Sequence, residues 1–192
     1  MVLDRSYGGD RVLSNVSLDQ IKNIKDEIDV YLEIDSVNQL LFEGFIEYYD
    51  LNRSQFKLYN AHQNILSQKK ISDKPILLMT YDPFSNILLQ KGYQEIASSK
   101  LSTINIIDLL VVKESVYQKY PDVFSQLRKS INLAIKHLED DPYEYYKMVE
   151  HYLEGQTYDE FLSSLNGIKF IKTATDEKLY LDIYQRQIQK KN

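Results

Sequence analysis

The sequence contains no cysteine and no tryptophan, and only four prolines and six glycines among its 192 residues. Without cysteine the chain cannot form a disulfide framework, a zinc–thiolate centre, an iron–sulfur cluster or a thiol nucleophile. No apolar run approaches the roughly 20 residues of a membrane-spanning helix. The first residues also lack the basic start and apolar core of a signal peptide. We therefore expect either a cytosolic protein or one whose leader has been removed.

Several site signatures are missing as well. The 28 acidic and 23 basic residues are spread along the chain and give a net charge of −5, so there is no basic stripe for a nucleic-acid partner. Neither a G-x-G-x-x-G nor a P-loop pattern occurs, and no G-x-S-x-G elbow is present. His62, His137 and His151 are far apart in the sequence. We therefore expect no nucleic-acid partner, no cofactor and no metal site.

Strand and helix patterns alternate up to residue 112, and helical patterns follow. Apolar content of 43% suits a globular core. Expected strands cover 2–4, 28–34, 56–60, 75–80 and 104–112, and expected helices cover 16–24, 37–49, 84–90, 121–138 and a last segment from about Thr175. The run at 104–112 is long and β-branched enough for a central strand. This order predicts an α/β protein with a largely parallel sheet.

Polar residues collect where the expected strands end. The candidate ligand-binding residues come from three such loops and are Ser6, Asp10, Ser36, Tyr81 and Asp82. In open α/β sheets ligands bind at the carboxyl ends of the strands. A set of polar loop tips without a nucleophile or a cofactor motif is more typical of a receptor than of a catalyst, so we expect no catalytic residue.

Two of these loops allow alternative interpretations. Ser36 precedes a helical stripe, so it either contributes to an anion site at the helix N-terminus or simply caps its own helix. In Tyr81-Asp82-Pro83, the proline suits the first position of the next helix. That placement would leave Tyr81 and Asp82 free to face a ligand.

The order of these elements resembles that of ABC-transporter substrate-binding proteins of the nitrate, alkanesulfonate, taurine and thiamine-precursor group. "VLDRSYGGDRVLS" is similar to the segment in which that family passes from its first lobe into its second. "TYDPFSNILLQKGYQEIASSK" is similar to its Trp-Glu-Pro strand end, with Tyr81, Asp82 and Pro83 at the three positions. Where the family usually has Gly-Ser or Gly-Thr, this chain has Asp35-Ser36. The likeness covers residues 2 to about 172 and is carried by the order of degenerate motifs.

The resemblance implies the type II periplasmic binding protein fold, with one complete lobe and the C-terminal helical part of the other. On this interpretation lobe two covers residues 14–105, and residues 1–13 and 106–192 form the remainder of lobe one. A full member has further strands before this start. Their absence would leave a sheet edge open, which a homodimer or a strand swap could cover.

The resemblance further implies a solute-binding component of an ABC importer, periplasmic or membrane-associated outside the cell, that traps a small polar molecule between two lobes and delivers it to a permease. The family's ligands suggest a sulfonate, nitrate or a pyrimidine, whereas the negative charge of Asp35 favours an amine-like or zwitterionic ligand. One alternative is an extracytoplasmic sensing domain of a signalling protein. A second is a relative of a pyrimidine-precursor synthesis enzyme, although that enzyme uses a cysteine-rich segment that this chain lacks.

Overall fold

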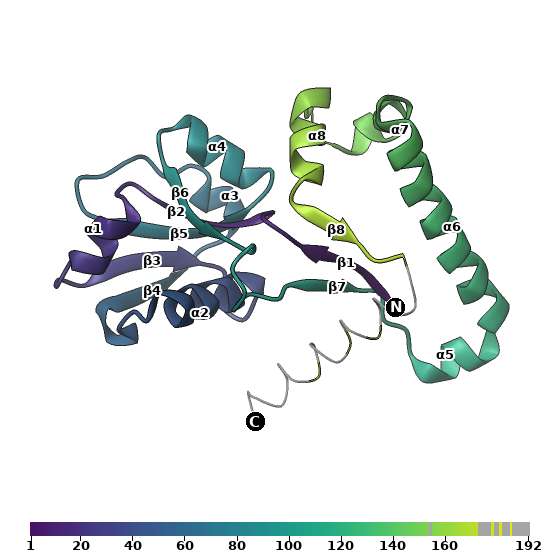
Figure 1. Ribbon diagram of the computed structural model, residues 1–192, viewed down its shortest axis with the longest axis horizontal. Coiled ribbons are helices and arrows are strands. Elements are labelled where there is room, and N and C mark those ends of the chain that lie inside the picture. Colours follow the sequence, from purple (N-terminus) through teal and green to yellow (C-terminus); the bar gives the residue numbers. More distant parts are fainter. Residues whose placement is uncertain (154, 173–177, 179–180, 182–184, 186–192) are drawn as a thin grey trace. The chain divides into compact units, whose positions relative to one another are not determined.

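The computed structural model describes residues 1–153, 155–172, 178, 181 and 185 (Figure 1). The chain divides into two compact units. One unit is Ser6–Ile106, and the other combines Met1–Arg5 with the chain from Ile107 onward. The lobe boundary expected between residues 13 and 14 falls inside a strand, β2 (Asp10–Ser14), so the Ser6–Ile106 unit begins before it. Equating the two units with the lobes of a binding protein is a proposal.

The Ser6–Ile106 unit is built on a five-stranded sheet with the order β4-β3-β5-β2-β6. Its strands are β2 (Asp10–Ser14), β3 (Ile28–Leu32), β4 (Phe56–Asn60), β5 (Ile76–Tyr81) and β6 (Gln94–Ser98). β3 is parallel to β4 and β5, whereas β2 is antiparallel to both β5 and β6. The sheet is therefore mixed, not largely parallel as expected. The reason is that β2 begins beside the end of β5, with Asp10 opposite Tyr81, and so runs in the opposite direction.

Helices cover both faces of this sheet (Figure 1). They are α1 (Leu18–Asn23), α2 (Val37–Tyr49), α3 (Gln63–Leu66) and α4 (Phe84–Gln90), with a 3-10 turn at Arg53–Gln55. Alternate residues of β5 point to opposite faces, as the strand geometry requires. Leu77 and Met79 join a buried cluster with α2, and Leu78 joins the cluster with Leu66 of α3 and Leu88 of α4. The unit thus has an apolar core on each side of its sheet.

The other unit contains a three-stranded sheet and four helices among the described residues. The strands are β1 (Val2–Ser6), β7 (Ile107–Leu109) and β8 (Ile168–Phe170), in the order β7-β1-β8. The helices are α5 (Glu114–Lys119), α6 (Pro121–Asp140), α7 (Pro142–Val149) and α8 (Tyr158–Leu165), with a 3-10 turn at Glu150–Tyr152. Most of the expected helix from about Thr175 lies outside the described residues. No described helix is both long and apolar enough to cross a membrane.

The expectation of a central strand over residues 104–112 is wrong. Only Ile107–Leu109 is a strand, and it lies at a sheet edge. The apolar run is divided instead: Ile104 and Ile106 are buried in the core beside α2, whereas Leu110–Val112 is exposed. A mostly apolar segment is thus divided between two units, and periodicity alone does not reveal this division.

Candidate functional site

All five predicted site residues lie in the Ser6–Ile106 unit, at the edge where β3, β4 and β5 end and β2 begins. Asp10 is opposite Tyr81 in the antiparallel β2–β5 pair, and Leu32 is beside Asn60 in the parallel β3–β4 pair. The structure therefore brings Ser6, Asp10, Tyr81 and Asp82 together around β2 and β5. Ser36 follows β3, the other neighbour of β5.

Ser6 and Asp10 hold the loop that leads into β2. The hydroxyl groups of Ser6 and Ser99 share a hydrogen bond of 2.7 Å, and the amide of Gly8 donates to the Ser99 hydroxyl at 2.7 Å. The Asp10 amide donates to Ser6 Oγ at 3.3 Å, and the Asp10 carbonyl accepts from the Ser99 amide at 2.9 Å. Because Ser6, Asp10 and Ser99 are all buried, these bonds fix the loop from inside.

Tyr81 ends β5 in a half-buried position. Its ring packs edge-on against Phe84, with 5.7 Å between the ring centroids. Burial raises the pKa of the Tyr81 hydroxyl, and the negative charges of Glu33 and Asp10 raise this pKa further. The hydroxyl therefore stays neutral across the physiological range and can both donate and accept a hydrogen bond.

Asp82 is engaged by protein groups. One carboxylate oxygen lies 3.2 Å from Nη2 of Arg11, and the other accepts from the Ser85 hydroxyl. The Asp82 side chain is only 12% exposed. Pro83 occupies the N-cap position of α4, not the first helical position, and the Asp82–Pro83 peptide bond is cis. Asp82 is thus held in place by α4 and β2.

Arg11 also lies at this edge, and sequence reasoning did not single it out. Besides Asp82, its guanidinium contacts Glu95 at 3.5 Å, the Asn86 side chain at 3.3 Å and the Gly8 carbonyl at 3.3 Å. Its sequence neighbours gave no signal, because all three side-chain partners are distant in the chain and meet it only through the β2–β5 and β2–β6 pairing.

Ser36 is the N-cap of α2. Its hydroxyl accepts from the Asn38 amide at 3.1 Å and donates to the Glu33 carbonyl at 2.7 Å. The capping interpretation is therefore realised, and the site role remains a prediction. Asp35 before it has φ of 60°, the left-handed region that glycine and, next best, Asn and Asp tolerate.

A second group of polar residues at this edge was also missed. Asn38, Gln63 and Thr80 are buried. The Gln63 amide joins them: Nε2 donates to Asn38 Oδ1 at 2.7 Å, and Oε1 accepts from the Thr80 hydroxyl at 2.8 Å. The Gln63 backbone amide donates to Glu33 Oε1 at 3.1 Å. Sequence offered only a weak signal, namely a polar residue where each helix begins.

The charge at this edge is mainly negative. Asp10, Glu33, Asp35 and Asp82 are its carboxylates. The guanidinium of Arg11 is shared between Asp82 and Glu95, and the ammonium group of Lys100 lies beside Gly8. The described residues contain no group of three or more His, Asp or Glu side chains placed to hold a metal ion. The arrangement can donate and accept hydrogen bonds, and it offers carboxylates to a cation.

Comparisons with known proteins reveal the fold. No protein-family description matches this sequence, and no curated protein matches it. Among solved structures, the periplasmic aliphatic sulphonate binding protein SsuA from Escherichia coli is similar, with a TM-score of 0.66 and 12% identity over 97% of this chain and 67% of that one. The alkanesulfonate-binding protein SsuA from Xanthomonas axonopodis pv. citri, bound to MOPS, has a TM-score of 0.65 and 12% identity over 97% and 68% of the two chains.

A third similar structure is the ligand binding component of an ABC-type import system from Staphylococcus aureus with zinc bound, with a TM-score of 0.63 and 13% identity over 95% and 65% of the chains. The expected fold class is confirmed: the chain has the mixed α/β fold of type II periplasmic binding proteins and spans about two thirds of their length. All three neighbours are binding proteins by name, and none is named as an enzyme.

Proposed function

We propose that this chain is the solute-binding component of an ABC importer, or the ligand-binding part of one, and that it binds a small polar molecule without covalent chemistry. The observation that carries the proposal is that Asp10, Glu33, Ser36 and Tyr81 lie together where β3 and β5 end and β2 begins. That edge is where open α/β sheets bind ligands. A permease partner and a location outside the cytoplasm belong to the same proposal.

The charge of the edge favours a ligand that carries a cationic group. Arg11, one of the cations at this edge, already faces the carboxylates of Asp82 and Glu95. A sulfonate or nitrate would therefore have to compete with them and would also meet Asp35. An amine or a zwitterion would instead place its positive charge near Asp10 and Glu33, the two groups whose charges act on Tyr81.

The proposed roles follow from the contacts. Tyr81 offers a ring for stacking and a neutral hydroxyl, Ser36 and the α2 N-terminus offer hydrogen bonds, and Asp10 and Glu33 meet the cation. Ser6 shapes the loop beside Asp10, and Asp82 fixes Arg11. Ser6 and Asp82 thus act chiefly by positioning their neighbours.

Calorimetric titration of the 192-residue chain with spermidine, arginine, uracil, methanesulfonate and nitrate tests the proposal. We expect spermidine or arginine to bind and the two anions not to bind. Ser36→Ala should weaken that binding up to about tenfold, since it removes one hydrogen-bonding group. Absence of binding throughout a broad thermal-shift screen of polar metabolites would contradict the proposed function.

Ser17→Ala is the matched control. Ser17 caps α1, which precedes β3, whereas Ser36 caps α2, which follows it. Both variants should lose about 1 kcal/mol of stability through the lost cap, but only Ser36→Ala should lose affinity. Equal affinity in both variants would remove Ser36 from the site.

Asp35→Gly separates charge from backbone geometry, because glycine adopts the required φ without strain. We expect the variant to fold normally and to bind the cationic ligand more weakly. A gain in affinity for methanesulfonate would support the role of Asp35 in excluding anions. Tight anion binding by the unaltered chain would instead overturn the cationic-ligand assignment and leave the binding function standing.

A further inference from the structure

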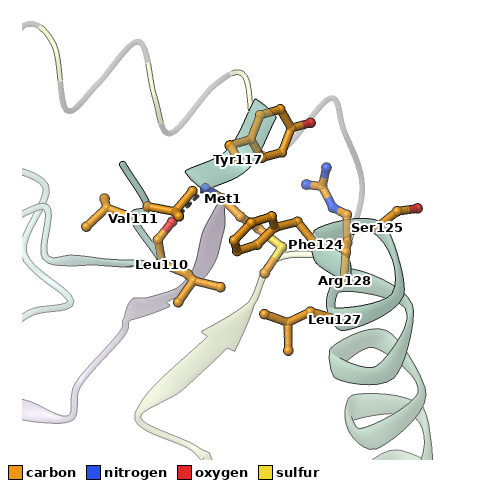
Figure 2. Close-up of a pocket in the computed structure, with 9 residues that line it drawn as sticks. Met1, Leu110, Val111, Tyr117, Phe124, Ser125, Leu127 and Arg128 are labelled. Carbon is orange, nitrogen blue, oxygen red and sulfur yellow. Dashed lines mark hydrogen bonds between the residues drawn. The ribbon is translucent and has the colours of Figure 1, made fainter. Parts of the chain in front are cut away.

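An apolar groove lies within the unit that contains α5 and α6, away from the proposed ligand edge in sequence. It has a volume of about 570 Å³ and lies between the end of β7, the first residue of the chain and the α5–α6 pair (Figure 2). Its apolar lining residues include Met1, Leu110, Val111, Tyr117, Phe124 and Leu127. Nothing in the proposed solute-binding function uses this groove.

The groove exposes large apolar side chains to water. Val111 is 79% exposed, Tyr117 48% and Leu127 39%. Of the 20 residues of α6, only Ile135 and Leu138 are buried, although the helix has a continuous apolar stripe. Isolated exposed apolar residues are ordinary, but a contiguous apolar patch marks an interaction surface.

We propose that this groove is the docking surface for a second copy of the chain. The exposed apolar side chains of residues 110–127 offer an area on the order of several hundred Å², the scale of one partner's share of a stable interface. In a two-fold dimer the same face is buried twice, once from each copy. Among the described strands β7 lies at the edge of its sheet, so two copies of it can also pair through their backbones.

The charges around the groove suit contact between identical faces. Glu114 and Lys119 lie on α5, Asp122 lies in the first turn of α6, and Arg128 lines the groove itself. Because both signs are present on one face, a two-fold axis can place an acid of one copy opposite a base of the other. A face with charges of one sign would repel its own copy.

Sedimentation equilibrium of the 192-residue chain tests the proposal, with Val111→Asp and Leu127→Asp as groove variants. We expect the unaltered chain to be a dimer at micromolar concentration and each groove variant to weaken dimerisation at least tenfold. Leu133→Asp is the control, because Leu133 is 66% exposed on the same helix but lies nine residues, or about two and a half turns, from Phe124 and so faces the opposite side. This control should still dimerise.

A second measurement covers the case in which a groove variant fails to fold. Since the chain has no cysteine, Val111→Cys introduces the only thiol, and mild oxidation should cross-link the dimer with little change in circular dichroism. A monomeric unaltered chain would overturn the proposal and leave the groove to a different polypeptide segment. Equal loss of dimer in Leu133→Asp, or a dimer insensitive to both groove variants, would also overturn it.

Discussion

Arg11 shows how one partly buried cation can hold several elements of the Ser6–Ile106 unit. Its guanidinium joins β2 to Asp82 and to Asn86 of α4, and its side chain is only 14% exposed. Arg11→Met should destabilise the protein by about 2–3 kcal/mol, because it leaves the Asp82 carboxylate buried without its ion partner. Urea unfolding followed by circular dichroism measures this loss.

A double-mutant cycle isolates the Arg11–Asp82 interaction from other consequences of the substitution. Asp82→Asn in the Arg11→Met background should recover part of the lost stability, since no unpaired carboxylate then remains. Asp73→Asn, at an exposed loop position, serves as the control and should not recover it. If the effects of the two site substitutions simply add, the proposed coupling does not exist.

At the scale of elements, α2 packs closely against Thr103 and Ile104 at Gly44. A Cβ built there would lie 2.5 Å from Cγ1 of Ile104 and 3.3 Å from the Thr103 carbonyl oxygen. Alanine is favoured over glycine inside helices by about 1 kcal/mol, but here the collision outweighs that preference. Gly44→Ala should therefore destabilise the protein by about 1–3 kcal/mol in urea unfolding. Glu47→Ala, on the exposed side of α2, should change it little, and a stabilised Gly44→Ala would contradict the close packing.

The pairing of β1 with β7 brings two acids together, because Asp4 is opposite Asp108. Burial, the charge of Asp108 and a hydrogen bond between the two carboxyl groups raise the pKa of Asp4 from 3.8 to about 7. The folded state thus binds a proton that the unfolded state releases. The stability that this proton confers is complete below pH 3.8 and is lost as the pH rises to about 7.

Asp108→Asn should reduce this pH dependence, because it removes the charge of Asp108 and the hydrogen bond between the two carboxyl groups but leaves the burial of Asp4, which is the largest cause. Because Asp4 is only half-buried, solvent screening reduces the effect, and we expect the variant to gain about 1 kcal/mol over the unaltered protein at pH 8 and little at pH 4. Unfolding in urea at both pH values measures the difference. A constant difference between the two proteins across this range would exclude the acid pair as its cause.

Periodicity predicted individual elements well, but it failed where the structure depends on contacts between segments that are distant in the chain. Apolar spacing and caps indicated β3, α2, β5 and α6, since these signals are local. The direction of β2 and the partnership of Arg11 with Asp82 depend on which strands pair, and no local pattern encodes this. The same reasoning proposed Ser36 and Tyr81 from their loops but did not single out Gln63, whose bonds to Asn38 and Thr80 form only in the folded unit.

At the scale of the whole molecule, apolar burial is unevenly distributed between the two units. Both large apolar clusters lie in the Ser6–Ile106 unit, whereas the described part of α5 buries no residue. We expect amide hydrogens of β3 and β5 to exchange slowest and those of α5 to exchange orders of magnitude faster. Hydrogen exchange followed by mass spectrometry checks this, and equal protection of both units would contradict it.

The Ser6–Ile106 unit begins and ends at the same point. The Ser6 amide donates to the Ile106 carbonyl at 3.0 Å, so the two ends of this stretch touch although a hundred residues separate them in the chain. A segment of this kind is topologically a self-contained insertion, and such segments tolerate rearrangement of chain order. Its ends could be joined by a short linker and the chain reopened at the exposed turn of Lys25 and Asp26, giving a circularly permuted module that could be moved into an unrelated host protein.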